Sequence, residues 1–344
     1  MNRIRIGIQV TVAAFCTAAV AAMIGLASPA GAQAGNPVVM KLSTATVNDT
    51  QHEWLKRFAA AVEKDSGGRI KGEIYPASQL GAIPRQIEGT QFGSIQGWVG
   101  PPEFLVGVDQ RYEVLSAPGL FSSREQYLRV INDPAVRDLI LGLGANKGLI
   151  GAGIFPIGPS SIITKKPIHS LADYTGLKIR VLASQFQLEL IKRMGGSPVA
   201  MTLADVLPAL QQGAIDGSLT TITQYTTLHY IDAAKNVVET GQPYVSSIAV
   251  LSKKWVDGLP PDLQKIVRED ALKVSTDIVP FINEFFDAQR KIWMDSGGSL
   301  TSLPAADQAA FMSKISSIGV DVSASKPDLN SAVKVVMASA VRNK

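Results

Sequence analysis

One charged side chain, Arg180, stands in the middle of an apolar segment, between Ile179 and Val181. Residues 178–182 have the pattern of a strand, in which successive side chains point to opposite faces, so Arg180 is expected to point away from both apolar neighbours. A buried guanidinium needs a partner, and its planar fork of N–H groups matches a carboxylate bidentately. Two partners fit these residues equally well: an internal Asp or Glu, and an acidic ligand.

Residues that carry enzyme chemistry are sparse in the rest of the chain. The three histidines, His52, His169 and His229, are far apart in sequence, and Cys16 is the single cysteine. No G-x-S-x-G elbow, H-E-x-x-H pair or P-loop occurs. Residues 142–148 resemble a dinucleotide loop, but the third glycine is one place late and the segment follows a predicted helix. We therefore predict no catalytic residue, no cofactor and no metal site.

The charge balance is close to neutral. The chain has 33 Lys and Arg against 29 Asp and Glu, a formal charge of +4. Arg3 and Arg5 lie in a segment that we expect to be removed, and subtracting them leaves 31 against 29, or +2. Nucleic-acid binding relies on many Lys and Arg side chains that neutralise phosphates, so this balance gives no case for a nucleic-acid partner.

The first 34 residues have the pattern of an export signal. Basic residues within positions 1–5 precede an uncharged apolar stretch at 6–26, and residues 28–34 read SPAGAQA, with small residues where a signal peptidase reads. The alternative is a membrane anchor, because about 20 apolar residues are enough to span a bilayer. The Ser-Pro pair and the Ala-x-Ala pattern favour cleavage, after Ala32 or Ala34. The mature protein is then expected in a bacterial periplasm.

Strand and helix patterns alternate along the mature chain. Strands are predicted at residues 38–43, 69–75, 93–99, 149–154, 178–182, 199–201 and 217–220. Helices are predicted at residues 52–66, 83–92, 124–131, 134–143, 184–194, 203–213, 305–317 and 327–341. Alternation on this scale predicts an α/β architecture with mainly parallel sheets.

A single long helix is predicted at residues 260–295, which carry regularly spaced apolar side chains and no glycine. Pro280 is the only interruption, and it is expected to kink the helix or split it. A helix of roughly 35 residues is about 50 Å long at 1.5 Å per residue, which exceeds one small domain. We therefore expect it to lie across two domains.

Several short motifs resemble, in their order and spacing, those of one family. They are YPASQLG at residues 75–81, KKPI at 165–168, SLADYTGLKIRV at 170–181, MGGSP at 194–198, ALQQGAIDG at 209–217, SKKW at 252–255 and LPPDLQK at 259–265. Over nearly the whole mature chain they resemble the periplasmic substrate-binding subunits of TRAP transporters (tripartite ATP-independent periplasmic transporters). The resemblance implies a two-lobed clamshell that the long helix spans, and a binding protein rather than an enzyme. It also implies that Arg180, the arginine of GLKIR, binds the substrate carboxylate.

Two departures from the family's pattern bear on the ligand. Many members have a second arginine near residues 159–160, where this chain has Ser160 followed by Ser161, and many have Gln-Glu-Asn-Pro where residues 218–221 read SLTT. Both changes remove charge or strong polarity from the expected cleft, so we expect a ligand with one carboxylate and a neutral or partly apolar body. The substrate-binding residues predicted with Arg180 are Trp98, Ser160, Leu203, Thr220, Gln224 and Tyr225. Trp98 and Tyr225 fit a place in the core equally well.

The resemblance also implies the domain organisation and the partners. After the signal peptide at residues 1–34, one lobe comprises residues 35–157 with about 248–285, and the other 158–247 with about 286–344. Strands near Gly158 and Val250 join the lobes, which are expected to close around a small organic acid. The closed protein, expected to be a monomer, delivers the acid to small and large integral membrane subunits. Two alternatives stay open: the clamshell of an ATP-driven or sensory system, and an exported lyase or hydrolase acting on a carboxylate.

Overall fold

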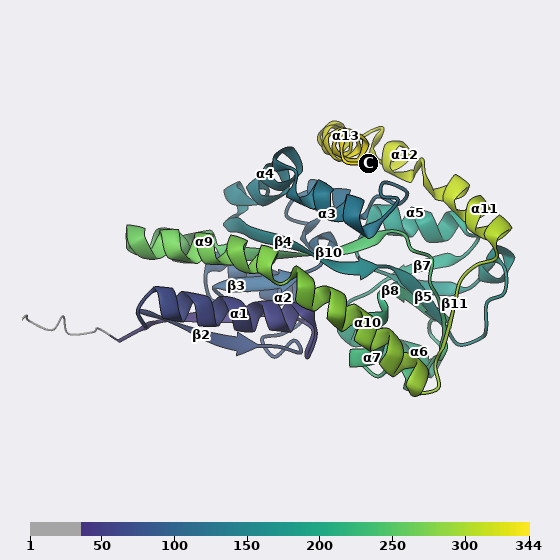
Figure 1. Cartoon of the computed structure of the whole chain (residues 1–344), viewed down its shortest axis with the longest axis horizontal. Helices are drawn as coiled ribbons and strands as arrows, with labels where there is room; N and C mark the ends of the chain where they lie inside the picture. The colour runs from purple at the N-terminus through teal and green to yellow at the C-terminus, as the bar shows by residue number, and fades with distance from the viewer. Residues whose placement is uncertain (1–35) are drawn as a thin grey trace, which may run out of the picture. The chain divides into compact units, whose positions relative to one another are not determined.

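Two β-sheets organise residues 36–344, the part of the chain that this computed structural model describes (Figure 1). The first sheet has the order β2 (Ile70–Tyr75), β1 (Val38–Ser43), β3 (Gly97–Gly100), β10 (Tyr244–Ser252), β4 (Leu149–Pro159). The second has the order β11 (Ser299–Thr301), β9 (Asn236–Val238), β5 (Ser161–Thr164), β8 (Gly217–Thr220), β6 (Lys178–Val181), β7 (Ser197–Ala200). The predicted export signal, with Cys16 and the cleavage sites, lies outside the described residues.

Both sheets are mixed. Among the described residues, five of the nine strand pairings are parallel and four are antiparallel, and every antiparallel pairing involves β5 or β10. The predicted α/β class is confirmed. The chain leaves the first sheet at the end of β4 and enters the second at β5, and β10 returns it, with Val245 opposite Gly158. The strands predicted near Gly158 and Val250 are therefore neighbours in the first sheet.

The helices pack on the faces of the sheets. They are α1 (Thr50–Asp65), α2 (Ile83–Phe92), α3 (Arg124–Asn132), α4 (Pro134–Gly142), α5 (Gln185–Arg193), α6 (Leu203–Gln212), α7 (Ile222–Thr227), α8 (Lys253–Asp257), α9 (Pro261–Asp277), α10 (Val279–Asp295), α11 (Ala305–Ile315), α12 (Ile318–Ser323) and α13 (Pro327–Arg342). Side chains of β10 alternate between the two faces of the first sheet: Leu251 packs in the cluster formed with α1 and α9, and Val250 in the cluster formed with α2, α3 and α4. This alternation buries both faces of the first sheet.

The predicted long helix is present as two helices, α9 and α10, which meet at Ile278. Pro280 lies in the first turn of α10, where its missing N–H costs little, whereas inside one continuous helix it would remove a hydrogen bond and clash with the preceding turn. Helix α9 packs against α1 and β4 of the first sheet, and α10 packs against α7 beside the second (Figure 1). Phe286 and Trp293 of α10 belong to the second sheet's core. The prediction that this segment spans both sheets is confirmed.

Within residues 36–344 there is no helix with the length and apolar character that crossing a membrane requires.

Candidate ligand-binding site

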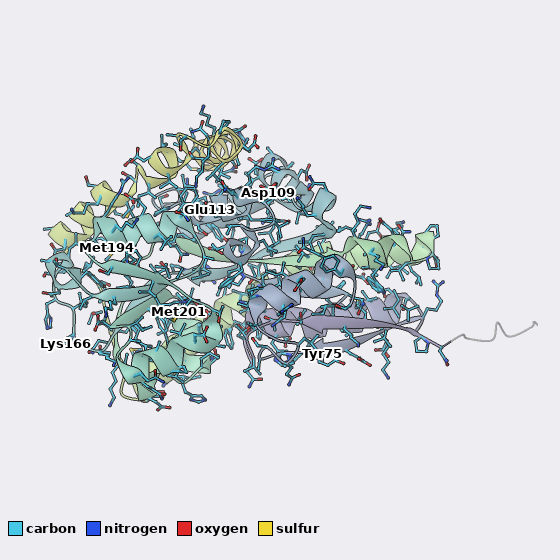
Figure 2. The ribbon with its side chains drawn as sticks, turned by 180° about the vertical axis from the view of Figure 1, so that it is seen from behind. Tyr75, Asp109, Glu113, Lys166, Met194 and Met201 are labelled. Atoms are coloured by element: carbon cyan, nitrogen blue, oxygen red, sulfur yellow. The ribbon has the colours of Figure 1, made fainter. Side chains whose placement is uncertain are left out.

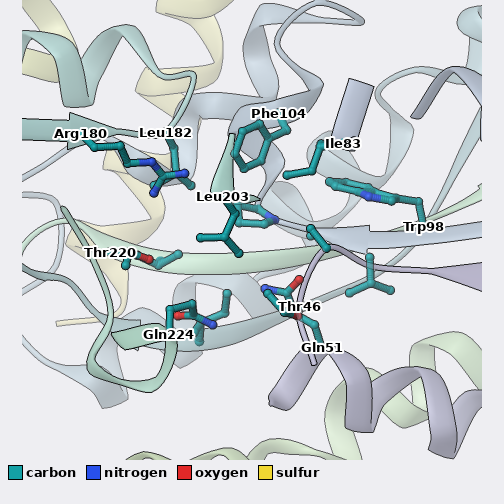
Figure 3. Close-up of a pocket in the computed structure, with 16 residues that line it drawn as sticks. Thr46, Gln51, Ile83, Trp98, Phe104, Arg180, Leu182, Leu203, Thr220 and Gln224 are labelled. Carbon is teal, nitrogen blue, oxygen red and sulfur yellow. The ribbon is translucent and has the colours of Figure 1, made fainter. Parts of the chain in front are cut away.

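A cavity lies where the two sheets approach each other, with about 400 Å³ of empty space including its opening to solvent. The first sheet and its helices contribute most of the apolar wall, and the second sheet contributes the only charged side chain (Figure 3). The lining residues are Ala45, Thr46, Gln51, Ile83, Trp98, Val99, Gly100, Pro101, Phe104, Ile157, Arg180, Leu182, Leu203, Thr220, Gln224 and Val245. The space limits an occupant to a small molecule.

Arg180 is held in the wall by the strand that the sequence predicts. In β6 its neighbours Ile179 and Val181 pack in the cluster on the opposite face, so the alternation of the strand turns Arg180 toward the cavity. Its side chain is only 1% exposed. Nε and Nη2 donate to the carbonyl oxygen of Met201, at 3.1 and 3.0 Å. Met201 follows β7 and is labelled in Figure 2. The Nε and Nη2 side of the guanidinium is thereby fixed in orientation.

No carboxylate of residues 36–344 accepts a hydrogen bond from Arg180, and its Nη1 has no partner among them. Burial lowers the pKa of Arg180 from its usual value, which is the effect of removing a cation from water without a paired anion. Glu103 is the acid whose charge acts on Arg180, but it makes no ion pair with Arg180 in residues 36–344, and burial raises the pKa of Glu103 to about 7, so near neutral pH about half of it is protonated. Residues 36–344 therefore do not contain the internal salt bridge.

Trp98 forms the opposite wall. Its ring, 1% exposed, lies beside Ile83 and faces Arg180 across Leu203 (Figure 3). A Cβ at Gly100 would lie 2.3 Å from Cζ2 of this ring, so only glycine leaves room for it. The indole Nε1 is buried and has no hydrogen-bond partner in the described residues. An unpartnered buried donor costs free energy, which a ligand with an acceptor can recover.

A hydrogen-bond network connects the two sheets along one side of the cavity. Asp49 caps α1 by accepting from the backbone N–H groups of Gln51 and His52, and it accepts from the Thr46 hydroxyl at 2.9 Å. Its other oxygen accepts from Nε2 of Gln224, on α7, at 3.2 Å. Burial raises the pKa of Asp49 to about 6. This contact crosses from the first sheet's layer to the second's.

Five of the seven residues predicted for the site line the cavity: Trp98, Arg180, Leu203, Thr220 and Gln224. Tyr225 does not; its hydroxyl lies 2.7 Å from the carbonyl oxygens of both Ser161 and Ser218, and it accepts from the N–H of Thr220 at 3.0 Å. Tyr225 thus connects β5 and β8 in the core. Ser160, between β4 and β5, is also buried outside the lining. Whether the five lining residues contact a ligand stays a prediction.

Eleven of the sixteen lining residues were not predicted, and three of these eleven are polar or aromatic: Thr46, Gln51 and Phe104. Thr46 and Gln51 follow the carboxyl end of β1, where ligands bind in open α/β sheets, and the polar run TATVNDTQ at residues 44–51 was the available signal. Phe104 lies in a single 3₁₀ turn after two prolines, and no local pattern distinguishes it from a core residue.

These features define a clamshell-type α/β binding protein with a cavity between its two sheets. The chain belongs to the bacterial extracellular solute-binding proteins, family 7 (DctP), whose family model matches residues 42–323. It is 30% identical to the uncharacterised protein YiiZ of Salmonella typhimurium over 69% of this chain and 72% of that one. It is 29% identical to the C4-dicarboxylate-binding periplasmic protein DctP of Rhodobacter capsulatus, over 75% of this chain and 77% of that one.

Solved structures of TRAP periplasmic solute-binding proteins share the fold. A protein from Desulfovibrio salexigens with bound orotic acid superposes with a TM-score of 0.84 at 22% identity, covering 89% of this chain and 99% of that one. One from Sulfitobacter sp. NAS-14.1 with bound β-D-galacturonate has a TM-score of 0.81 at 24% identity, covering 87% and 99%. One from Shewanella oneidensis with bound succinate has a TM-score of 0.82 at 21% identity, covering 90% and 100%.

Proposed function

We propose that this chain is the periplasmic solute-binding protein of a TRAP transporter and captures a small organic acid through one carboxylate. The observation that carries the proposal is Arg180, a buried guanidinium in the cavity wall whose Nη1 has no partner in residues 36–344. A planar fork with one side fixed on a carbonyl offers its other side to a carboxylate. The family and the acids named in the related structures support the same class of ligand.

The number of carboxylates follows from the charges around the cavity. Arg180 is the only cation among the lining residues, and no acid lines it. Aliphatic and aromatic side chains make up most of the remaining wall. A second carboxylate would lie buried against these side chains without a counter-charge, which is costly. This chemistry supports a monocarboxylate over a dicarboxylate such as the one in the Shewanella oneidensis structure.

Capture follows from closure of two lobes. We assign residues 36–157 with about 248–285 to one lobe and 158–247 with about 286–344 to the other, each carrying one sheet. A ligand that touches Arg180 on the second sheet and Trp98 on the first gains both sets of contacts only when the lobes are closed. That difference in affinity is what shifts the population toward the closed form. The closed form is then delivered to the membrane subunits.

Calorimetry with a library of mono- and dicarboxylates tests this function. The expected result is one-to-one binding of a monocarboxylate, no measurable binding of succinate, and recovery of the ligand chemically unchanged after denaturation. Absence of binding by every carboxylate would refute the proposal. Conversion of the bound acid to a product by the purified protein would instead support the alternative of an exported lyase or hydrolase.

A further inference from the structure

A buried carboxylate connects the two lobes at a point outside the ligand cavity. Glu113, which is labelled in Figure 2, lies in the 3₁₀ segment η2 (Gln110–Ser116) of the first sheet's lobe and is 1% exposed. Its Oε2 accepts from the Ser184 hydroxyl at 2.9 Å and from the backbone N–H of Gln185 at 2.7 Å. Ser184 and Gln185 begin α5, in the second sheet's lobe. Within residues 36–344, both of these hydrogen-bond donors thus come from the other lobe.

The carboxylate suits the end of the helix that it contacts. The N-terminus of a helix has backbone N–H groups without partners and a partial positive charge, so it favours an anion. The first turn of α5 contains no acidic residue of its own. Burial raises the pKa of Glu113 above its usual value, while the hydrogen bonds from Ser184 and Gln185 and the charge of Lys326 act in the opposite direction. A helix of one lobe is therefore stabilised by an acidic side chain of the other.

Both sides of this contact lie close in sequence to the cavity wall. Leu182 lines the cavity, and Ser184 follows it by two residues. In the other lobe, η2 packs against the 3₁₀ segment η1 (Pro102–Leu105), which carries the lining residue Phe104. Figure 3 draws Leu182 and Phe104 on the same side of the cavity. Glu113 thus joins a wall segment of one lobe to a wall segment of the other.

We propose that Glu113 is a latch for the closed form: its bonds to Ser184 and Gln185 hold the lobes together and slow the release of a bound acid. The inference rests on the proposed function, because it needs two lobes that open and close. Separating the lobes breaks both bonds, so these bonds stabilise the closed form alone. Glu113 does not line the cavity and acts as a positioning residue. A latch that forms after the acid has entered changes the dissociation rate and leaves the association rate unaltered.

The binding kinetics of Glu113→Gln test the latch. Glutamine has nearly the same shape and keeps one carbonyl acceptor, but it lacks the charge that strengthens both bonds. The probe is the tightest-binding acid among acetate, pentanoate, benzoate, 2-oxopentanoate and succinate. Stopped-flow tryptophan fluorescence is expected to show dissociation about five- to tenfold faster than in the wild type, with association within about twofold. Ser184→Gly removes one donor at an N-cap position that tolerates glycine, and it should make dissociation about threefold faster.

Glu239→Gln is the matched control. Glu239 accepts from Nη2 of Arg290 at 2.9 Å, and both residues belong to the second sheet's lobe. This variant loses a carboxylate contact within one lobe, so both rate constants should stay within about twofold of the wild type. Misfolded protein would lower the stoichiometry measured by calorimetry rather than change a rate constant, and circular dichroism checks that all variants are folded.

The outcomes separate the latch from the function on which it rests. A dissociation rate of Glu113→Gln within about twofold of the wild type would overturn the latch and leave a carboxylate-binding protein. An equal acceleration in Glu239→Gln would also overturn it, because the effect would then not depend on a contact between lobes. So would a loss of affinity that lies in the association rate. If no acid of the panel binds the wild type, the proposed function itself fails, and the latch with it.

Discussion

Replacing Arg180 by methionine separates a ligand clamp from a structural arginine, because the two roles predict opposite effects on stability. Methionine keeps most of the aliphatic stem and removes the charge. If the guanidinium pairs with a ligand carboxylate inside the cavity, removing one partner of that buried pair costs about 3–5 kcal/mol. At about 1.4 kcal/mol per tenfold, affinity is expected to fall by a factor on the order of a hundred to several thousand.

The unliganded protein is expected to respond in the other direction. Arg180 is a buried cation with no carboxylate partner in residues 36–344, and taking such a charge out of water costs several kcal/mol. Its removal leaves the carbonyl of Met201 without two donors, a loss of about 1–3 kcal/mol. The first effect is the larger, so Arg180→Met should have a melting temperature equal to or above that of the wild type without ligand. Ligand-induced stabilisation should be lost.

Isothermal titration calorimetry and thermal unfolding measure both effects on the same samples. Arg193→Met is the matched control, because Arg193 pairs with Glu189 at 3.0 Å and with Asp321 at 2.7 Å outside the cavity. That variant should unfold at a lower temperature and bind with unchanged affinity. Arg180→Lys should recover only part of the affinity, because a point charge replaces the planar fork. An affinity of Arg180→Met within about threefold of the wild type would refute the clamp.

Three further predictions concern the surroundings of the clamp. Gly100→Ala places a Cβ 2.3 Å from the Trp98 ring, so the ring must move; we expect unfolding to become easier by about 1–3 kcal/mol in urea titrations, together with a change in Trp fluorescence. For Glu103, burial raises the folded-state pKa from 4.5 to about 7, so the folded protein holds a proton that the unfolded chain releases and stability falls as the pH rises from about 5 to 8. Glu103→Gln should lose less unfolding free energy over this pH range than the wild type, by up to about 3 kcal/mol. Equal pH dependence of stability in the wild type and the variant would contradict the raised pKa of Glu103. Finally, Asp49→Asn and Gln224→Ala should show a coupling of about 1 kcal/mol in a double-mutant cycle of ligand affinity, because their 3.2 Å hydrogen bond joins the two sheets beside the cavity; additive effects would rule this out.

Much of the fold could be predicted because its signals are local. Residues 83–92 were predicted as a helix with the bounds that α2 has, and Gly67 and Gly68, both in the left-handed region, end α1 as glycine does after a helix. Strands of three or four residues, such as β5, β9 and β11, carry too few side chains for an alternation to be read, and their pairing depends on segments far away in the sequence. The antiparallel pairings of β5 and β10 were missed because the direction of pairing is set by the partner strands and leaves no mark within a single strand.

In the site, too, residues with a local signal could be predicted, and residues whose role depends on distant contacts could not. Arg180 could be singled out from the sequence because a charged side chain in the middle of an apolar strand needs a partner wherever the strand lies in the fold. The position of Tyr225 could not be decided from the sequence, because its hydroxyl could reach either a ligand or the backbone. Its contacts with the carbonyl oxygens of Ser161 and Ser218 exist only after β5 and β8 pair.

The same unsatisfied groups that identify the site also determine how strongly a ligand drives closure. A closed, empty cavity leaves Arg180 Nη1 and Trp98 Nε1 without protein partners among the described residues. A ligand that pairs both recovers about 3–5 kcal/mol for the charged group and about 1–3 kcal/mol for the neutral one. Shifting the protein from about 1% closed to about 99% closed requires a ligand to favour the closed form by about 5.5 kcal/mol. The combined gain from the two groups, about 4–8 kcal/mol, includes this value. Neither group alone reaches this threshold, so an acid that satisfies only Arg180 should bind weakly and close the protein incompletely. Selectivity and closure are therefore two consequences of one donor arrangement.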